Sequence, residues 1–298
     1  MPTDLQRPSN KYSAKTGALF VLGAGAVWST IGIGVRLIEE ASVWQILFYR
    51  SISMALFLYV IIRLRTGEGP FGPIRRNNLA MGVAGVSLFA AYSSGIYALQ
   101  NTSVANAMLL FAAAPFMAAI LGWIIMRERI RATTWITMAI AVGGIAIMVG
   151  DKSGGVALKG SLSALLSAIG FAAFTVALRR GRTGEMLPAV FLSAIIAILI
   201  TAFVCASQGL TFVLTPRDGS IALGMGVFQA GAGLVLYTLG SRSLPAAELT
   251  LLSMTEVLLG PVWVWLFLGE TAGIYTLIGG FVLLAAIAGN ALSGKSQT

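Results

Sequence analysis

Residues 251–265, LLSMTEVLLGPVWVW, carry one ionisable side chain, Glu256, in a stretch that is otherwise almost wholly apolar. The whole chain has the same character. Of its 298 residues 57% are hydrophobic and 10% are charged, whereas soluble domains carry about 25% charged residues. This composition predicts an integral membrane protein. Because a carboxylate facing lipid is costly, we expect Glu256 to face protein or water.

Apolar segments long enough to cross a membrane recur along the chain. A hydrocarbon core about 30 Å thick requires about 20 apolar residues in a helix. Dividing the chain at its polar breaks predicts ten transmembrane helices, at 17–38, 43–64, 79–99, 103–126, 132–150, 159–179, 187–207, 219–240, 246–268 and 272–293. The connections between them are short, so we expect an all-α polytopic membrane protein with little room for a soluble domain.

The basic residues predict the orientation of these spans. With the N-terminus inside, 15 of the 20 Lys and Arg residues fall on the cytoplasmic side and three fall outside. Positively charged loops are retained in the cytoplasm, so this bias predicts that both termini are cytoplasmic, in the inner membrane of a bacterium. It also explains the net charge of +9 without nucleic acid, and predicts membrane lipid as a partner of the basic face.

The two halves of the chain align with each other at an offset of about 143 residues. Trp28 then falls on Phe171 and Arg36 on Arg179, while Glu128 meets Glu270 at an offset one shorter. Five spans in each copy is an odd number, so the second copy must enter the membrane from the opposite side. The sequence therefore predicts two inverted five-helix repeats, 17–150 and 151–293, between cytoplasmic tails at 1–16 and 294–298.

Several classes of activity are disfavoured by what the chain lacks. It has no His and a single cysteine, Cys205, so we expect neither a metal site nor a cofactor. No phosphate-binding G-x-x-x-x-G-K-[ST] loop occurs, which argues against direct use of ATP. An intramembrane protease is also disfavoured, because a Ser–His pair is impossible and the three aspartates fall outside the predicted spans, at Asp4, Asp151 and Asp218. We therefore do not expect an enzyme.

The motifs in both halves resemble a known transporter family. GALFVLGAGAVWSTIGIGVRL (17–37), an arginine in the next span, AAAPFMAAILGWIIMRE (112–128) and LLGPVWVWLFLGE (258–270) are similar to the EamA branch of the drug/metabolite transporter superfamily. Length and aromatic content resemble bacterial amino-acid exporters of the YddG type. The resemblance implies secondary export of small metabolites by alternating access. One departure is that Glu256 precedes Val257, whereas the second copy of the family commonly has Glu-Pro there.

Polar and aromatic residues at mid-depth are the candidates for a substrate cavity. Burial of polar groups in a bilayer requires partners, so these side chains are predicted to bind substrate or neighbouring helices. The candidates are Trp28, Tyr92, Ser93, Phe171, Thr175, Gln229 and Glu256. Glu256 is also a candidate for proton coupling, with a structural pairing to Arg50 as the alternative. Trp28 is the mid-span tryptophan, and close packing of helices through its neighbouring glycines is its alternative role.

Two prolines interrupt predicted spans in corresponding parts of the repeats. Pro115 lies in the fourth span and Pro261 in the ninth, and each weakens its helix. We predict that they act as hinges during alternating access, with static kinks as the alternative. The substrate is predicted to be a neutral or aromatic amino acid. The alternatives are other metabolites or drugs, and a channel-like facilitator.

Overall fold

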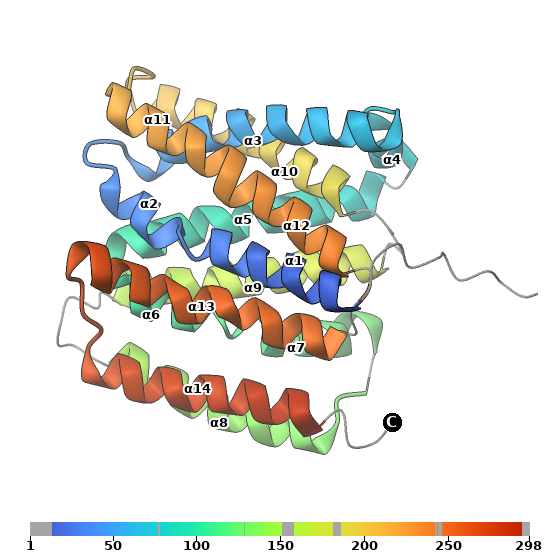
Figure 1. Ribbon diagram of the computed structural model, residues 1–298, viewed down its shortest axis with the longest axis vertical. Coiled ribbons are helices and arrows are strands. Elements are labelled where there is room, and N and C mark those ends of the chain that lie inside the picture. Colours follow the sequence, from blue (N-terminus) through green and yellow to red (C-terminus); the bar gives the residue numbers. More distant parts are fainter. Residues whose placement is uncertain are drawn as a thin grey trace, which may run out of the picture.

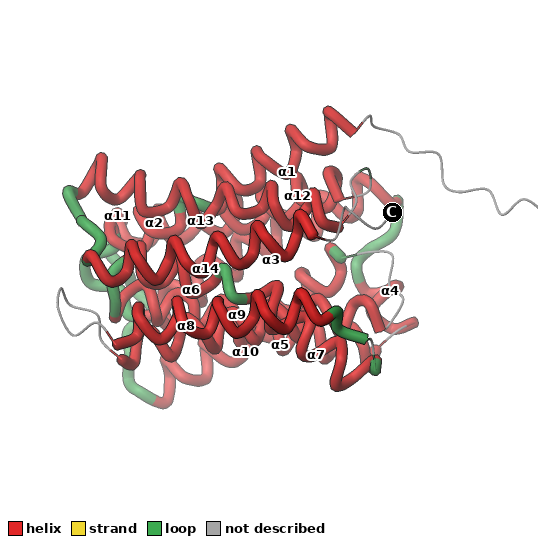
Figure 2. The backbone as a smooth tube through the Cα atoms, turned by 90° about the horizontal axis from the view of Figure 1, so that it is seen from below, coloured by secondary structure: helices red, strands yellow, loops and turns green. Residues whose placement is uncertain are grey.

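The described part of the chain is entirely helical. A computed structural model describes residues 14–76, 78–127, 129–150, 158–180, 186–241, 243 and 246–293, and no strand occurs in these segments. The tube view shows helices that run roughly along a common direction (Figure 2). Both predicted tails, apart from residues 14–16, and Glu128 lie outside the described residues.

The helices correspond to the predicted spans, with some divided. They are α1 (Ala14–Trp28), α2 (Ile31–Leu37), α3 (Val43–Thr66), α4 (Phe71–Arg76), α5 (Asn78–Asn101), α6 (Val104–Phe111), α7 (Ala114–Met126), α8 (Ala132–Gly150), α9 (Leu158–Arg180), α10 (Leu187–Ser207), α11 (Pro216–Gly224), η1 (Met225–Ala232), α12 (Gly233–Ser241), α13 (Ala246–Leu268) and α14 (Ile274–Ser293). Within the described residues, eight helical stretches are long and apolar enough to cross a membrane, and Leu252–Leu268 and Ile274–Asn290 are shorter apolar helices. Eight predicted spans are thus supported, and the count of ten stays a prediction.

Local sequence explains where several helices begin and end. Ser42 and Gln45 form a reciprocal capping box at the start of α3, and Gly67 ends that helix in the left-handed conformation that glycine adopts without strain. Ser103 caps α6 in the same way that Thr215 caps α11. The eighth span therefore starts earlier than predicted, and Asp218 lies in the first turn of α11 rather than in a loop.

Three predicted spans are not continuous α-helices. The first breaks between α1 and α2, the fourth breaks at Ala112–Ala113 between α6 and α7, and the eighth contains the π-helical segment η1. The expected kink at Pro115 is thus a break just before it, and Pro115 lies in the first turn of α7. By contrast, α13 runs through Pro261 without a break. Irregular backbone at membrane depth occurs where it is covered by protein or lines a cavity.

The helix contacts have the pattern of a two-fold related pair of repeats. The third and sixth spans pack together as α5 and α9, and their counterparts, the eighth and first, pack together as α12 and α1. The fourth span (α6 and α7) contacts α9, and its counterpart, the ninth span (α13), contacts α1. The remaining spans pair with their own counterparts, α3 with α10 and α8 with α14. This supports the predicted repeat, although its domain boundaries stay a prediction.

The start of α1 and the end of α14 lie at the same end of the bundle (Figure 1). We call this the terminal end, and we call the opposite end, which carries the loop between α13 and α14, the Glu270 end. One buried hydrophobic cluster joins α2, α6, α8 and α14, and a second joins α3, α5, α9 and α10. The side chain of Tyr92 packs against both clusters and lies between them.

Candidate functional site

An arginine lies in the interior of the bundle without a charged partner. Arg50 on α3 is only 4% exposed, and its Nη2 donates to Oε1 of Gln229 at 3.4 Å. Its guanidinium carbon lies 5.0 Å from the ring centroid of Tyr92, a distance at which cation–π attraction acts. Gln229 and Tyr92 were predicted site residues, and the structure brings them together around an arginine that was not among the predicted site residues.

Close approach of two backbones places these residues side by side. A Cβ at Gly226 would lie 2.2 Å from the carbonyl oxygen of Arg50 and 1.9 Å from Oγ of Ser53. Ser53 donates to the carbonyl oxygen of Leu223 at 2.8 Å, which ties α3 to the end of α11. The absence of a side chain at Gly226 therefore lets η1 lie directly on α3 and bring Gln229 to Arg50.

The hydroxyl of Tyr92 is already bound. It donates to the carbonyl oxygen of Ser193 on α10 at 2.7 Å, so the ring, rather than the hydroxyl, is the part presented to Arg50. The hydroxyls of Ser93 and Thr175 donate to carbonyl oxygens of their own helices, at Ala90 and Phe171. Such bonds satisfy the donors locally, so Ser93 and Thr175 offer less to a ligand than the sequence suggested.

Two further aromatic side chains share a hydrophobic cluster with Tyr92. Trp28 on α1 and Phe171 on α9 pack against the same hydrophobic cluster as Tyr92. Trp28 lies directly over Gly233, because a Cβ there would be 2.2 Å from the indole Nε1. Its ring centroid is 5.3 Å from that of Tyr237 at an angle of 38°. Trp28 therefore packs on a glycine of another helix and on Tyr237, and its role in a substrate cavity stays a prediction.

Glu256 lies in the contact between α1 and α13. Its backbone nitrogen would be 3.3 Å from a Cβ at Gly25, so the two helices touch at this level. The side chain is half-buried, and the described residues provide it with neither an ion pair nor a side-chain hydrogen bond. The alternative pairing with Arg50 is therefore not formed in this structure. Close by, Trp263 donates from Nε1 to Oγ of Ser29 at 2.8 Å, across the α1–α2 break.

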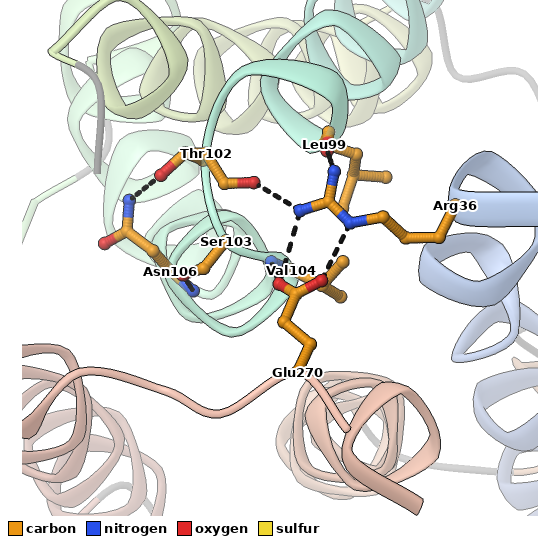
Figure 3. Close-up of polar contacts among 7 residues, drawn as sticks. All are labelled: Arg36, Leu99, Thr102, Ser103, Val104, Asn106 and Glu270. Carbon is orange, nitrogen blue, oxygen red and sulfur yellow. Dashed lines mark hydrogen bonds and ion pairs between the residues drawn. The ribbon is translucent and has the colours of Figure 1, made fainter. Parts of the chain in front are cut away.

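At the Glu270 end, a network of charged and backbone groups joins four helices (Figure 3). Nε of Arg36 lies 2.7 Å from Oε2 of Glu270, and its Nη1 and Nη2 each donate to a carbonyl oxygen, of Leu99 and Thr102, at 2.8 Å. Oε1 of Glu270 accepts from the backbone nitrogen of Val104 at 2.6 Å. The carboxylate therefore binds both the arginine and the N-terminus of α6, which favours negative charge.

Further bonds between the two halves lie at the same end. The carboxylate of Asp218 accepts backbone N–H groups of Glu39, Glu40 and Ala41 at 3.0–3.1 Å. The exposed side chains of Arg217 and Glu39 form an ion pair, and Nε2 of Gln45 donates to the carbonyl oxygen of Thr211 at 2.7 Å. The buried bonds of Asp218 and Gln45, rather than the exposed ion pair, hold the halves together at the Glu270 end in the state described here.

A surface pocket of about 310 Å³ lies between α6, α13 and α14, lined by Ala105, Pro261, Val262, Val264, Trp265, Glu270, Thr271, Ala272 and Leu277. Its lining is mostly apolar, and none of the seven predicted substrate residues contributes to it. Pro261 alone among the predicted hinges does so. The pocket is therefore separate from the interior cluster around Arg50, and it faces the outside of the bundle.

The two halves both match one family model. The model of the EamA-like transporter family covers residues 15–150 and again residues 158–292. This chain belongs to the EamA-like transporter family. The predicted resemblance is confirmed, and the protein is a multi-pass membrane transporter of small molecules.

Curated relatives of this EamA-like transporter carry only general names. The "Uncharacterized transporter YwfM" of Bacillus subtilis (strain 168) is 26% identical over 264 residues, which cover 85% of this chain and 86% of the relative. The "Uncharacterized transporter PA0485" of Pseudomonas aeruginosa is 23% identical over 135 residues, 44% of this chain and 45% of that protein. These names support transport and identify no substrate.

A crystal structure of another protein has the same fold as this EamA-like transporter. The two superpose with a TM-score of 0.63 at 16% sequence identity, over 95% of this chain and 99% of the other. At this identity the likeness shows the fold alone.

Arg50 was not predicted as a site residue because the sequence allowed its side chain to extend to the membrane surface. The signal that could have identified it is an arginine inside an apolar span.

Proposed function

We propose that this EamA-like transporter is a secondary exporter of neutral or aromatic amino acids, located in the inner membrane of a bacterium. The carrying observation is that Trp28, Tyr92 and Phe171 pack against one hydrophobic cluster, and that Tyr92 also contacts Arg50, which is bound to Gln229. Flat aromatic faces suit an aromatic or apolar side chain, and the amide and charged groups suit the polar end of an amino acid. The bacterial relatives support the location.

Alternating access would use the two halves as moving parts. The Glu270 end is held by bonds between the halves, and in this proposal those bonds keep that end closed until transport opens it. Ser29 at the break in the first span is buried, as are Ala112 and Ala113 at the break in the fourth and Gln229 in the π-helical part of the eighth. Backbone irregularity at such places can accommodate bending. Pro115 and Pro261 remain the proposed hinges.

Glu256 is the proposed proton-coupling residue. Its carboxyl is half-buried and has no bonded partner among the described residues, so it can exchange a proton or accept a bond from the substrate ammonium group. In proteoliposomes, Glu256→Gln is expected to keep transport down a substrate gradient and to lose stimulation by an imposed pH gradient. If wild-type transport is itself indifferent to the pH gradient, the protein is a facilitative exporter and this role is wrong.

The substrate proposal is tested by growth and by transport. Overexpression should confer resistance to toxic analogues of aromatic and neutral amino acids, and purified protein should exchange radiolabelled phenylalanine or leucine with saturable kinetics. Trp28→Ala should lower the apparent affinity about tenfold, equivalent to about 1.4 kcal/mol. Trp135→Ala, on the surface of α8, is the matched control and should transport normally. Absence of saturable amino-acid exchange, or equal loss in both variants, would refute the proposal.

A further inference from the structure

The guanidinium of Arg50 is buried with most of its donors unsatisfied. Nε and Nη1 have no acceptor and are inaccessible to solvent, and the contact of Nη2 with Gln229 is long at 3.4 Å. The face of Tyr92 supplies attraction but accepts no strong hydrogen bond. Arginine stays charged in proteins, and a buried charge without a partner is costly. The site is therefore incomplete in the state described here.

Arg36 shows how the same chain satisfies an arginine when the role is structural. Its donors reach a carboxylate and two carbonyl oxygens, which is the pairing expected of a partly buried guanidinium. Arg50 lies deeper, at 4% exposure, and has none of these acceptors within the described residues. Burial alone therefore does not explain the missing partner, because the fold provides acceptors for the donors of Arg36 but not for most donors of the more deeply buried Arg50.

No carboxylate among the described side chains accepts a hydrogen bond from Arg50. Glu270 is bound to Arg36, Asp218 to the backbone of 39–41, and Glu39 to Arg217. Glu40 and Glu68 are exposed, and Glu256 forms no ion pair with Arg50. The helices that pack against α3 are α10, α11, η1 and α5. Among their described residues the one acidic side chain is Asp218, whose carboxylate is bound to the backbone of 39–41. An acceptor for Arg50 must come from outside this cluster.

We propose that Arg50 binds the carboxylate of a small organic substrate, and that this carboxylate displaces the amide oxygen of Gln229. A planar guanidinium fork matches a carboxylate in bidentate geometry. Each bidentate edge of a guanidinium uses Nη2 together with Nε or Nη1, so the ligand must take the place of Gln229 at Nη2. The long contact is the one most easily exchanged. This inference rests on the proposed transport function and specifies the charge of its substrate.

Access to Arg50 requires movement of η1. In the described state Gly226 of η1 lies against the backbone of Arg50, and Gln229 of the same segment contacts the buried guanidinium, so the anion reaches the guanidinium when η1 separates from α3. A π-helical segment can change its hydrogen-bond register locally, and such segments are frequent at functional sites. While no substrate is bound, the amide oxygen of Gln229 occupies Nη2 of Arg50 in place of the substrate carboxylate.

Binding to the full-length protein in nanodiscs tests the site directly. The probes are phenylacetate and its neutral counterpart phenylacetamide, together with phenylalanine and phenylalaninamide, and the readouts are thermal shift and dissociation constant. Wild-type protein should bind each carboxylate at least about tenfold more tightly than its amide, as expected for a charge-assisted pair. Equal binding of acid and amide, or no binding of any carboxylate, would overturn the proposal. Equal stabilisation by inorganic phosphate would overturn the assignment to a carboxylate.

Gln229→Glu is the sharpest variant because it places a carboxylate where the amide oxygen lies. It should raise the melting temperature without ligand and abolish the preference for acids, since Arg50 then has a resident partner. Gln229→Met removes the oxygen without adding charge and should keep the preference. Arg50→Lys should weaken acid binding at least about tenfold, because Lys lacks the planar fork; Arg217→Gln, at an exposed arginine, is the control and should bind normally. Retained acid preference in Gln229→Glu would refute the proposal even if Arg50 variants fail to fold.

The two proposals can fail separately. If amino acids are not exchanged but phenylacetate still binds in an Arg50-dependent manner, the carboxylate site stands and the amino-acid assignment is wrong. If amino acids are exchanged and phenylalaninamide competes as well as phenylalanine, the exporter stands and the carboxylate site is wrong.

Discussion

Gly226 is the residue on which the interior cluster depends most directly. Its missing side chain lets η1 approach the backbone of Arg50 and the hydroxyl of Ser53. A methyl group there cannot be accommodated by moving a flexible side chain alone, since one of the two nearest atoms is a backbone oxygen. Close packing of this kind means that one added carbon must separate α3 from η1.

The expected effect of Gly226→Ala is a destabilisation of about 1–3 kcal/mol, as for overpacking elsewhere, with loss of the Arg50–Gln229 contact. Gly224→Ala is the matched control, because a Cβ at Gly224 meets nothing within 4 Å. The control should be neutral or slightly stabilising, since alanine favours the helix. Thermal unfolding of both variants in the same detergent measures the difference, and equal melting temperatures would contradict the predicted packing.

At the scale of elements, the two prolines are not equivalent. Pro115 lies in the first turn of α7, where an unbonded nitrogen costs nothing. Pro261 lies inside α13, where it removes a helical hydrogen bond at a cost of about 3 kcal/mol. The hinge role therefore depends more on Pro261, while the fourth span bends at its own break.

Pro261→Ala is expected to raise the melting temperature and to slow substrate exchange, because it restores the missing bond and stiffens α13. Pro115→Ala should change stability by less than about 1 kcal/mol. Parallel unfolding and exchange assays compare the two. Faster or unchanged exchange in a stabilised Pro261→Ala protein would show that the proline is a static kink.

The Arg36–Glu270 network connects α2, α5, α6 and the end of α13. Its side chains are 27% and 22% exposed, between the surface and buried extremes, so we expect Glu270→Gln to cost about 1–2 kcal/mol. The same variant should open this end and speed the labelling of a cysteine at Val35, which is buried on α2. Glu39→Gln breaks only the exposed pair with Arg217 and should change neither measurement. A lower melting temperature with unchanged labelling would indicate a purely structural network.

At the scale of the whole molecule, the charge bias predicts that the Glu270 end faces away from the cytoplasm. In intact cells, a membrane-impermeant maleimide should therefore label Glu39→Cys, and should label Glu68→Cys only after permeabilisation. Both positions are exposed, near opposite ends of α3. The parent protein is the control, because Cys205 is buried and should not react. The opposite labelling pattern would reverse the predicted orientation.

Much of this architecture follows from the sequence because a bilayer permits few solutions. Apolar segments of sufficient length must form helices, and lysine and arginine bias their orientation. The span positions and the family followed from those patterns and from the repeated motifs. The helix breaks did not, since a break at Ala112–Ala113 or a π-helical η1 depends on how neighbouring helices cover the backbone.

The sequence by itself determined that the protein is a helical membrane transporter of the EamA-like family. It also predicted Tyr92 and Gln229 as interior residues. Only the tertiary structure decided which of them meet. It joined Arg50 to Gln229 and Tyr92, gave Glu256 no ion pair among the described residues, and bound Arg36 to Glu270 across 234 residues. The physical reason is that composition and periodicity fix the environment of a segment, whereas partners depend on which glycine-lined faces approach closely enough to touch.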